Sequence, residues 1–237
     1  MAGTHVTIAA TSSATFDSYI ASPESEKGTG VVIISTISGV DSDMTYYADA
    51  LAAEGFVASA PDMFWRDSDP GPLPWTGDGR KRAFARNDRY DLELGMKDLA
   101  DVIANLKQHP RCNGKVAVMG FCFGGPFALL AAARYRTNAG ISFHGSHVEN
   151  HLDEVDGVHC PLSFHYGDRD EVGSADGDRA YPGSVRPAGG SQSLRVPRRR
   201  PRLHDYDAGP RLHRVSSPPR LGSNPRGAQK ASGMIRG

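Results

Sequence analysis

The residues best placed to do chemistry lie around one thiol, Cys122. Residues 116–119 form a short apolar run typical of a buried strand, and an alanine-rich stretch that favours a helix follows. Between the two, Gly120, Gly124 and Gly125 bracket the cysteine. A strand, a sharp Gly-x-Cys-x-Gly turn and a helix form the pattern of a nucleophile elbow, with the sulfur at a helix N-terminus where the dipole favours a thiolate. The alternative is a structural cysteine in a glycine-rich loop, since free cysteines are often buried.

The rest of the chain predicts the elements that would hold such an elbow. A helix capped by Asp41 or Ser42 is expected to end at Gly55, and further helices cover residues 90–106 and 127–133. Residues 61–82 read as a loop rich in Pro, Gly and Asp, and a loop of that length is usually functional. Strands alternating with helices predict an α/β fold with a mostly parallel, doubly wound sheet. Short apolar runs predict strands over residues 6–9, 16–21, 31–34, 56–60, 116–119, 139–143 and 162–166.

The chain divides into two parts of unlike composition. Residues 1–172 carry 14 Lys and Arg against 23 Asp and Glu, and residues 173–237 carry 13 against 4, so the zero net charge conceals opposite signs. The second part holds 12 Arg and 8 Pro and keeps neither a helical nor a strand period. We therefore predict one α/β domain over residues 1–172 and a disordered tail over 173–237, which leaves the C-terminal part of the fold incomplete.

Composition also bears on the cellular compartment. Three cysteines, no N-terminal signal sequence and no apolar run long enough for a bilayer predict a cytoplasmic protein without a disulfide framework or a membrane partner.

Several short motifs, in this order, resemble the dienelactone hydrolase family of α/β-hydrolases, which use a cysteine nucleophile. The resemblance runs from about Val31 to Val172. It implies hydrolysis of a lactone or carboxylic ester, through an acyl-enzyme, without a cofactor or a metal. The motifs are Ile37-x-Gly39-Val40, Ala53-Glu54-Gly55-Phe56, Ala60-Pro61-Asp62, Asp98-Leu99, Gly114-Lys115-Val116 and Gly120-Phe121-Cys122-Phe123-Gly124-Gly125.

The resemblance assigns roles to particular residues. It makes Cys122 the nucleophile and places the triad acid at Asp170, with Asp168 as a local competitor and turn capping as the structural alternative. The backbone N–H groups of Phe123 and Ile37 match the family's oxyanion hole, which stabilises developing negative charge.

Two further family positions concern the substrate and the thiol. Arg80 matches an arginine that binds a substrate carboxylate, although it could be an ordinary solvated charge and Arg82 could do the same. Thr36 stands where the family has a glutamate associated with keeping the thiol protonated. A threonine cannot act as that charged partner, so we expect a lactone or ester other than dienelactone itself.

The family's histidine, in a Tyr-x-Gly-Ala-x-His-x-Phe context, has no match in the chain as written. His204 lies near the expected distance from Asp170 but in different surroundings. Codons for residues 196–204, read from their second base, permit Tyr-Pro-Gly-Ala-x-His-Gly-Phe-Met, with the histidine under Pro201. We therefore hypothesise that the sequence after about Val172 is translated out of frame.

The main prediction is a hydrolase that acts on a small-molecule lactone or ester. The alternative is a catalytically impaired, truncated or frame-shifted relative that at most binds a small carboxylate. A weaker third hypothesis has the tail arginines bind nucleic acid, but few aromatic residues accompany them, so we expect no nucleic-acid partner.

Two more groups of residues each permit a functional and a structural interpretation. The first group could hold a metal or consist of ordinary loop residues, and its members are His144, His147, His151 and Cys160. The second group, Trp65 and Trp75, could line a cleft or simply pack.

Overall fold

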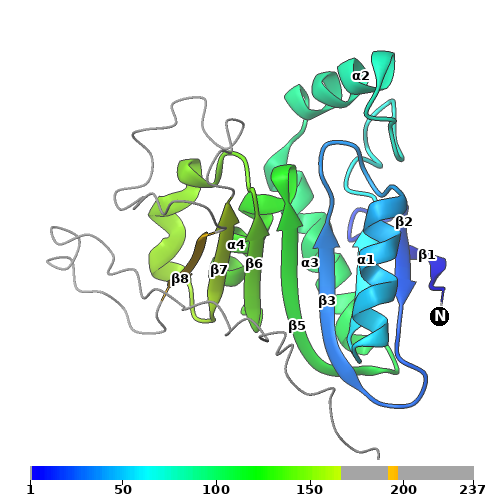
Figure 1. The fold of residues 1–237 in the computed structure, drawn as a ribbon, viewed down its shortest axis with the longest axis vertical. Coiled ribbons are helices and arrows are strands. Elements are labelled where there is room, and N and C mark those ends of the chain that lie inside the picture. The colour runs from blue at the N-terminus through cyan, green and yellow to red at the C-terminus, as the bar shows by residue number, and fades with distance from the viewer. Residues whose placement is uncertain (1, 167–191, 197–237) are drawn as a thin grey trace, which may run out of the picture.

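One mixed β-sheet organises the protein, and the computed structural model describes residues 2–166 and 192–196 of it. Its strands lie in the order β1-β2-β4-β3-β5-β6-β7-β8 (Figure 1). The five central strands, β4, β3, β5, β6 and β7, run parallel, while β1, β2 and β8 pair antiparallel at the edges. The strands are β1 Thr4–Ala9, β2 Thr15–Ala21, β3 Gly28–Ile34, β4 Val57–Pro61, β5 Cys112–Phe121, β6 Ala139–Phe143, β7 Leu162–Tyr166 and β8 Gln192–Val196.

Helices lie on both faces of the sheet, as Figure 1 shows. Helix α1 (Ser42–Ala53) covers one face, and α3 (Leu92–Gln108) and α4 (Gly125–Arg134) cover the other. The carboxylate of Asp41 accepts hydrogen bonds from the N–H groups of Asp43 and Met44, which confirms Asp41 as the N-cap of α1. The parallel central strands and the helices on both faces confirm the predicted α/β fold.

The two faces of the sheet bury separate apolar clusters. Side chains of alternate strand residues point to opposite faces, so Val116 and Val118 of β5 pack toward α3 and α4. Phe121 of the same strand packs on the other side, in the cluster that includes Met44 of α1. Its ring stacks on the ring of Tyr47, 5.2 Å between centroids, and on that of Phe143, 5.1 Å away.

Three elements differ from the sequence-based expectation. Helix α2 (Gly77–Asp88) occupies the end of the stretch predicted as a loop, and it stands beyond the carboxyl ends of the parallel strands (Figure 1). The 3-10 helix η2 (Val148–Gly157) replaces a predicted loop. Strand β8 lies in the tail for which no regular element was predicted, where backbone pairing with β7 forms a strand from only five residues.

Candidate active site

The strand–turn–helix around Cys122 forms as predicted. Strand β5 ends at Phe121, η1 spans Cys122–Gly124, and α4 follows at once. Cys122 has a φ of 49°, a left-handed conformation that is uncommon for a residue with a side chain and that often marks a functional turn. Its side chain is half-buried rather than enclosed in the core, whereas Cys112 and Cys160 are buried. Cys122 is therefore the thiol most open to a reagent.

Close approach of backbone segments explains the glycines of this turn. A Cβ added to Gly120 would lie 1.8 Å from the carbonyl oxygen of Gly124, and one added to Gly124 would lie 2.5 Å from that of Ile34. No side chain larger than hydrogen fits at either position without a backbone shift. The turn is thus packed directly against the end of β3.

A second loop, residues 144–147 after β6, closes on the thiol. The Ser146 Oγ lies 3.4 Å from the Sγ of Cys122, and the Ser146 N–H donates a 3.0 Å hydrogen bond to the Cys122 carbonyl. His144 and His147, on either side, both have left-handed backbones with φ of 40° and 61°. Ser146 was not singled out from the sequence. Its only signal there was its position after a predicted strand, at the same edge as the elbow.

The two residues expected to supply oxyanion donors come from neighbouring strands. Ile37 follows β3, and Phe123 follows β5, which pairs directly with β3. The order β4-β3-β5 reverses direction at this point, and open α/β sheets bind ligands at the carboxyl ends of strands at such a switch. Among the described residues, the Ile37 N–H donates to no acceptor. The Phe123 ring packs 4.7 Å from the rings of Phe64 and Tyr90.

Thr36 serves the backbone of the loop after β3. Its Oγ1 accepts a 3.1 Å hydrogen bond from the Ser38 N–H, and its carbonyl accepts one of 3.0 Å from Gly39. The hydroxyl therefore stabilises a turn and, unlike the family's glutamate, carries no charge.

Helix α2 carries the two arginines considered for substrate binding. Arg82 forms an ion pair with Asp69, with 2.7 Å between Nε and Oδ2, and this hydrogen bond holds the pKa of the Asp69 carboxyl below its usual range. Arg80 is exposed and forms no ion pair with a described residue, and its guanidinium lies 5.2 Å from the ring centroid of Trp75. Of these two arginines, Arg80 is therefore the one whose charge no described carboxylate neutralises.

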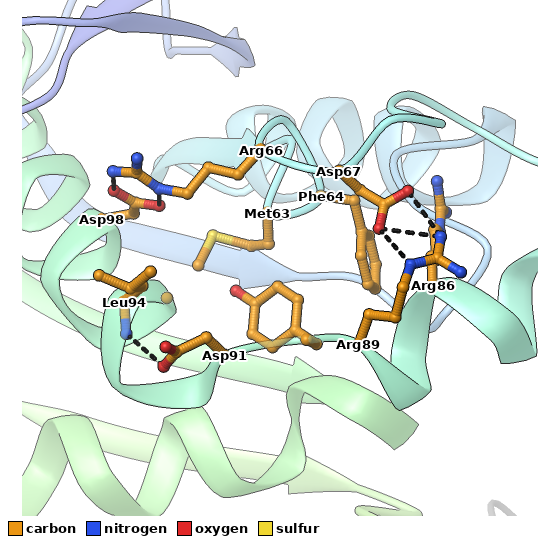
Figure 2. Close-up of a pocket in the computed structure, with 11 residues that line it drawn as sticks. Met63, Phe64, Arg66, Asp67, Arg86, Arg89, Asp91, Leu94 and Asp98 are labelled. Atoms are coloured by element: carbon orange, nitrogen blue, oxygen red, sulfur yellow. Dashed lines mark hydrogen bonds and ion pairs between the residues drawn. The ribbon is translucent and has the colours of Figure 1, made fainter.

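A pocket of about 160 Å³ lies between the loop after β4 and the start of α3 (Figure 2). Two ion pairs flank it, Arg66 with Asp98 and Asp67 with Arg89, and the ring of Phe64 forms part of the wall. Cys122 is not among its lining residues, so this pocket is separate from the thiol.

Trp65, considered as a cleft residue, has a packing role beside this pocket. Its Nε1 donates a 2.9 Å hydrogen bond to Asp98, and its ring stacks on Phe16. Trp75 is instead exposed, and its ring lies 5.9 Å from that of Phe84 on α2.

The histidines near the site form no metal centre with other described residues, since no group of three His, Cys, Asp or Glu side chains there could hold an ion. His165 stacks on Phe143, and burial lowers the pKa of its imidazole. The predicted triad residues Asp170 and His204, and the competitor Asp168, lie outside the described residues. No described helix has both the length and the apolar character needed to cross a bilayer.

Comparison with known proteins decides the family. Residues 16–181 match the dienelactone hydrolase family, which is more than half of the chain. The chain belongs to this family. A carboxymethylenebutenolidase of a Pseudomonas species is 32% identical over 86% of the chain and 82% of its own length. The carboxymethylenebutenolidase of Pseudomonas putida is 32% identical over 66% of the chain, and the chain spans 66% of that relative's length. The chain is thus a hydrolase by family.

Solved structures agree on the fold. A structure described as m3DLH matches with a TM-score of 0.60 at 21% identity, over 76% of the chain and 75% of its own. The dienelactone hydrolase of Anabaena variabilis matches with a TM-score of 0.53 at 18% identity, over 68% of the chain and 72% of its own.

Proposed function

We propose that this dienelactone hydrolase family member cleaves a lactone or carboxylic ester through nucleophilic attack by Cys122. The observation that carries the proposal is the half-exposed, left-handed Cys122 at the switch point of the sheet. A sulfur in that position can reach a carbonyl carbon placed outside the carboxyl ends of β3 and β5.

In the proposed reaction the thiolate attacks the carbonyl carbon, and the carbonyl π electrons move to the oxygen. The N–H groups of Ile37 and Phe123 stabilise that oxyanion. When the carbonyl re-forms, the ester C–O bond breaks, and the leaving oxygen takes a proton from an imidazolium. Water then attacks the thioester, a histidine accepts its proton, and the thiolate leaves. Asp170 would orient that histidine, for which His204 is the candidate in the chain as written.

For the substrate, we propose a lactone or ester that carries a carboxylate, bound by Arg80. The relatives named carboxymethylenebutenolidase act, by that name, on a lactone with an acidic side arm. The guanidinium of Arg80, which forms no ion pair with a described residue, fits such a group, because an arginine binds a carboxylate through two parallel hydrogen bonds. Thr36 stands in place of a carboxylate, and among the described residues the side-chain hydrogen-bond partner of the thiol is Ser146.

Turnover of p-nitrophenyl acetate by the full chain tests the nucleophile. We expect Cys122→Ala and iodoacetamide treatment to abolish p-nitrophenol release. Cys112→Ala and Cys160→Ala should leave it unchanged, since both thiols are buried. Mass spectrometry of the quenched reaction should find the acetyl group on Cys122. A Cys122→Ala chain that turns over at the wild-type rate would exclude the mechanism.

The same assay separates the main proposal from the catalytically impaired alternative. A competent enzyme releases p-nitrophenol continuously. A chain without a working base releases at most one equivalent, because the acetyl-thioester forms but is not hydrolysed.

A further inference from the structure

Arg86, on α2, is a buried arginine that forms no ion pair with a described residue. Its side chain is 0% exposed. Burial also lowers the pKa of the guanidinium, because removing it from water disfavours the charged form. A protein rarely buries an arginine without a carboxylate, so the groups that replace the carboxylate reveal what the residue does.

Those groups are backbone carbonyls from two separate loops. Nε and Nη2 of Arg86 donate to the Ile37 carbonyl, at 3.2 and 2.8 Å, and Nη1 donates to Asp69 and Gly71, at 3.0 and 2.6 Å. A further 2.8 Å hydrogen bond, from the Leu73 N–H to the Ser38 carbonyl, joins the same loops. The planar fork of one guanidinium thus holds the loop after β3 against the loop after β4.

The other side of Arg86 reaches the second oxyanion candidate. Its guanidinium carbon lies 4.0 Å from the centroid of the Phe64 ring, and Figure 2 shows the two side chains together. The Phe64 ring in turn packs 4.7 Å from that of Phe123. A single side chain therefore contacts Ile37 directly and Phe123 through one ring.

We propose that Arg86 is a positioning residue that fixes both walls of the oxyanion hole. Its hydrogen bonds hold the peptide that follows Ile37, and its contact with Phe64 supports the ring of Phe123. The two N–H groups are then fixed before the substrate arrives, as stabilisation of a developing oxyanion requires. This inference rests on the proposed function, because it concerns the carbonyl oxygen attacked by Cys122.

Two reactions of the same thiol separate this role from a general effect on folding. Acylation by p-nitrophenyl acetate passes through an oxyanion. Alkylation by iodoacetamide forms a carbon–sulfur bond as iodide leaves, without any oxyanion. Loss of a positioning residue should therefore slow acylation and spare alkylation, whereas a damaged elbow changes both.

The experiment uses Arg86→Lys and Arg86→Met in the full chain, with Arg82→Lys and Arg82→Met as controls on the exposed part of the same helix. We expect the acylation rate constant to fall about 10- to 100-fold in both Arg86 variants, as misplaced oxyanion donors cause. The alkylation rate constant should stay within about 2-fold of wild type. Hydrogen–deuterium exchange over residues 35–40 should accelerate in the Arg86 variants and not in the controls.

Three results would overturn the proposal: equal slowing of both reactions in Arg86→Lys, unchanged acylation, or unchanged exchange over residues 35–40. If Arg86→Met does not fold, Arg86→Lys decides, since it keeps the charge and loses only the fork. A wild-type chain that alkylates but never acylates would contradict the proposed function instead. Exchange over residues 35–40 would then still decide whether Arg86 holds the Ile37 loop.

Discussion

Strained backbone gathers around the thiol. Cys122, His144 and His147 all occupy the left-handed region, and the last two flank the serine that touches the sulfur. Such conformations persist only where the surrounding packing holds them, and they concentrate at functional sites. The 144–147 loop packs tightly against the first residue of α4, since a Cβ on Gly125 would lie 2.3 Å from the Cα of Gly145.

Ser146→Ala tests the contact between hydroxyl and sulfur. The hydroxyl can donate a hydrogen bond to the thiolate and so favour the charged, reactive form. We expect the rate of Cys122 alkylation at neutral pH to fall about 3- to 10-fold in this variant. Ser146→Thr, which keeps the hydroxyl, should restore most of the rate. Equal rates for wild type and Ser146→Ala would show that the contact does not affect the thiol.

Arg80→Gln tests substrate recognition. For an ester or lactone that carries a carboxylate, we expect KM to rise about 10-fold with little change in kcat, because a charge-assisted hydrogen bond is lost. A neutral aryl ester should be unaffected. Arg82→Gln is the matched control, since its partner is already Asp69. A larger effect from Arg82→Gln would assign the role to that residue.

Among single residues, the sequence predicts those that their neighbours in the chain mark as functional. Cys122 stands out because its glycines, strand and helix are neighbours in the chain. Arg86 and Ser146 act through contacts with residues far along the chain, Ile37 and Cys122, so no local pattern marks them. Arg86 also lies in a helix that is polar almost throughout, which hides its buried face.

Among the elements, the tight passage of β5 into α4 sets a strict limit on side-chain size. Gly120→Ala should lower the free energy of unfolding by about 1–3 kcal/mol or more, because the added methyl meets the Gly124 carbonyl at 1.8 Å. Gly157→Ala is the control, since its methyl would meet no atom closer than 3.3 Å. Urea denaturation of both variants measures the difference, and equal midpoints would contradict the close packing.

An ion-pair network ties α3, α4 and η2 together through Arg134, which bonds Glu93 and Glu154. The hydrogen bond from Arg134 holds the pKa of Glu154 below its usual range. Because the pKa of Glu154 is lowered in the folded state, its charge stabilises the fold at pH values above its unfolded-state pKa of about 4.3. This stabilisation is lost as the pH falls below that value and through the folded-state pKa.

Arg134→Gln should therefore cost about 1 kcal/mol at pH 7 and much less at about pH 3. Urea denaturation at the two pH values measures this difference. Glu93→Gln should have a smaller effect, because the Glu93 side chain is 67% exposed. An equal loss at both pH values would exclude a role for the Glu154 charge.

Regular elements were predictable where apolar periodicity is strong. Strands β6 and β7 have the predicted bounds, and α3 differs by two residues at each end. Helix α2 was missed because glycine and charged residues dominate it. Apart from Gly79, only Ala83 and Arg86 of this helix are buried. Tertiary contacts, not local preference, decide such a segment.

For the whole molecule, the sheet order places the site. Alternating strands and helices predicted a parallel sheet, and parallel strands gather their carboxyl ends at one edge. That edge was therefore predictable as the location of Cys122 and Ile37. Which strands neighbour one another was not, because pairing of β3 with β5 skips β4 in the chain.

The out-of-frame hypothesis makes a prediction about the gene. The coding DNA under residues 196–204, read from the second base of each codon, should encode the histidine motif. A chain expressed in that frame should hydrolyse p-nitrophenyl acetate about 10²- to 10⁴-fold faster than the chain as written, which is the usual effect of a general base. The reframed chain with alanine at the new histidine is the control. Absence of a histidine codon under Pro201 would end the hypothesis.

The seam between β3 and β5 also bears on how the protein folds. Ile34 and Gly120 pair there although about half of the described chain lies between them, and pairings of such long sequence separation form slowly. The glycine turn rests on the Ile34 carbonyl, so the left-handed Cys122 cannot be held until that seam has closed. The thiol of a newly synthesised chain is therefore unconstrained until β3 and β5 have paired.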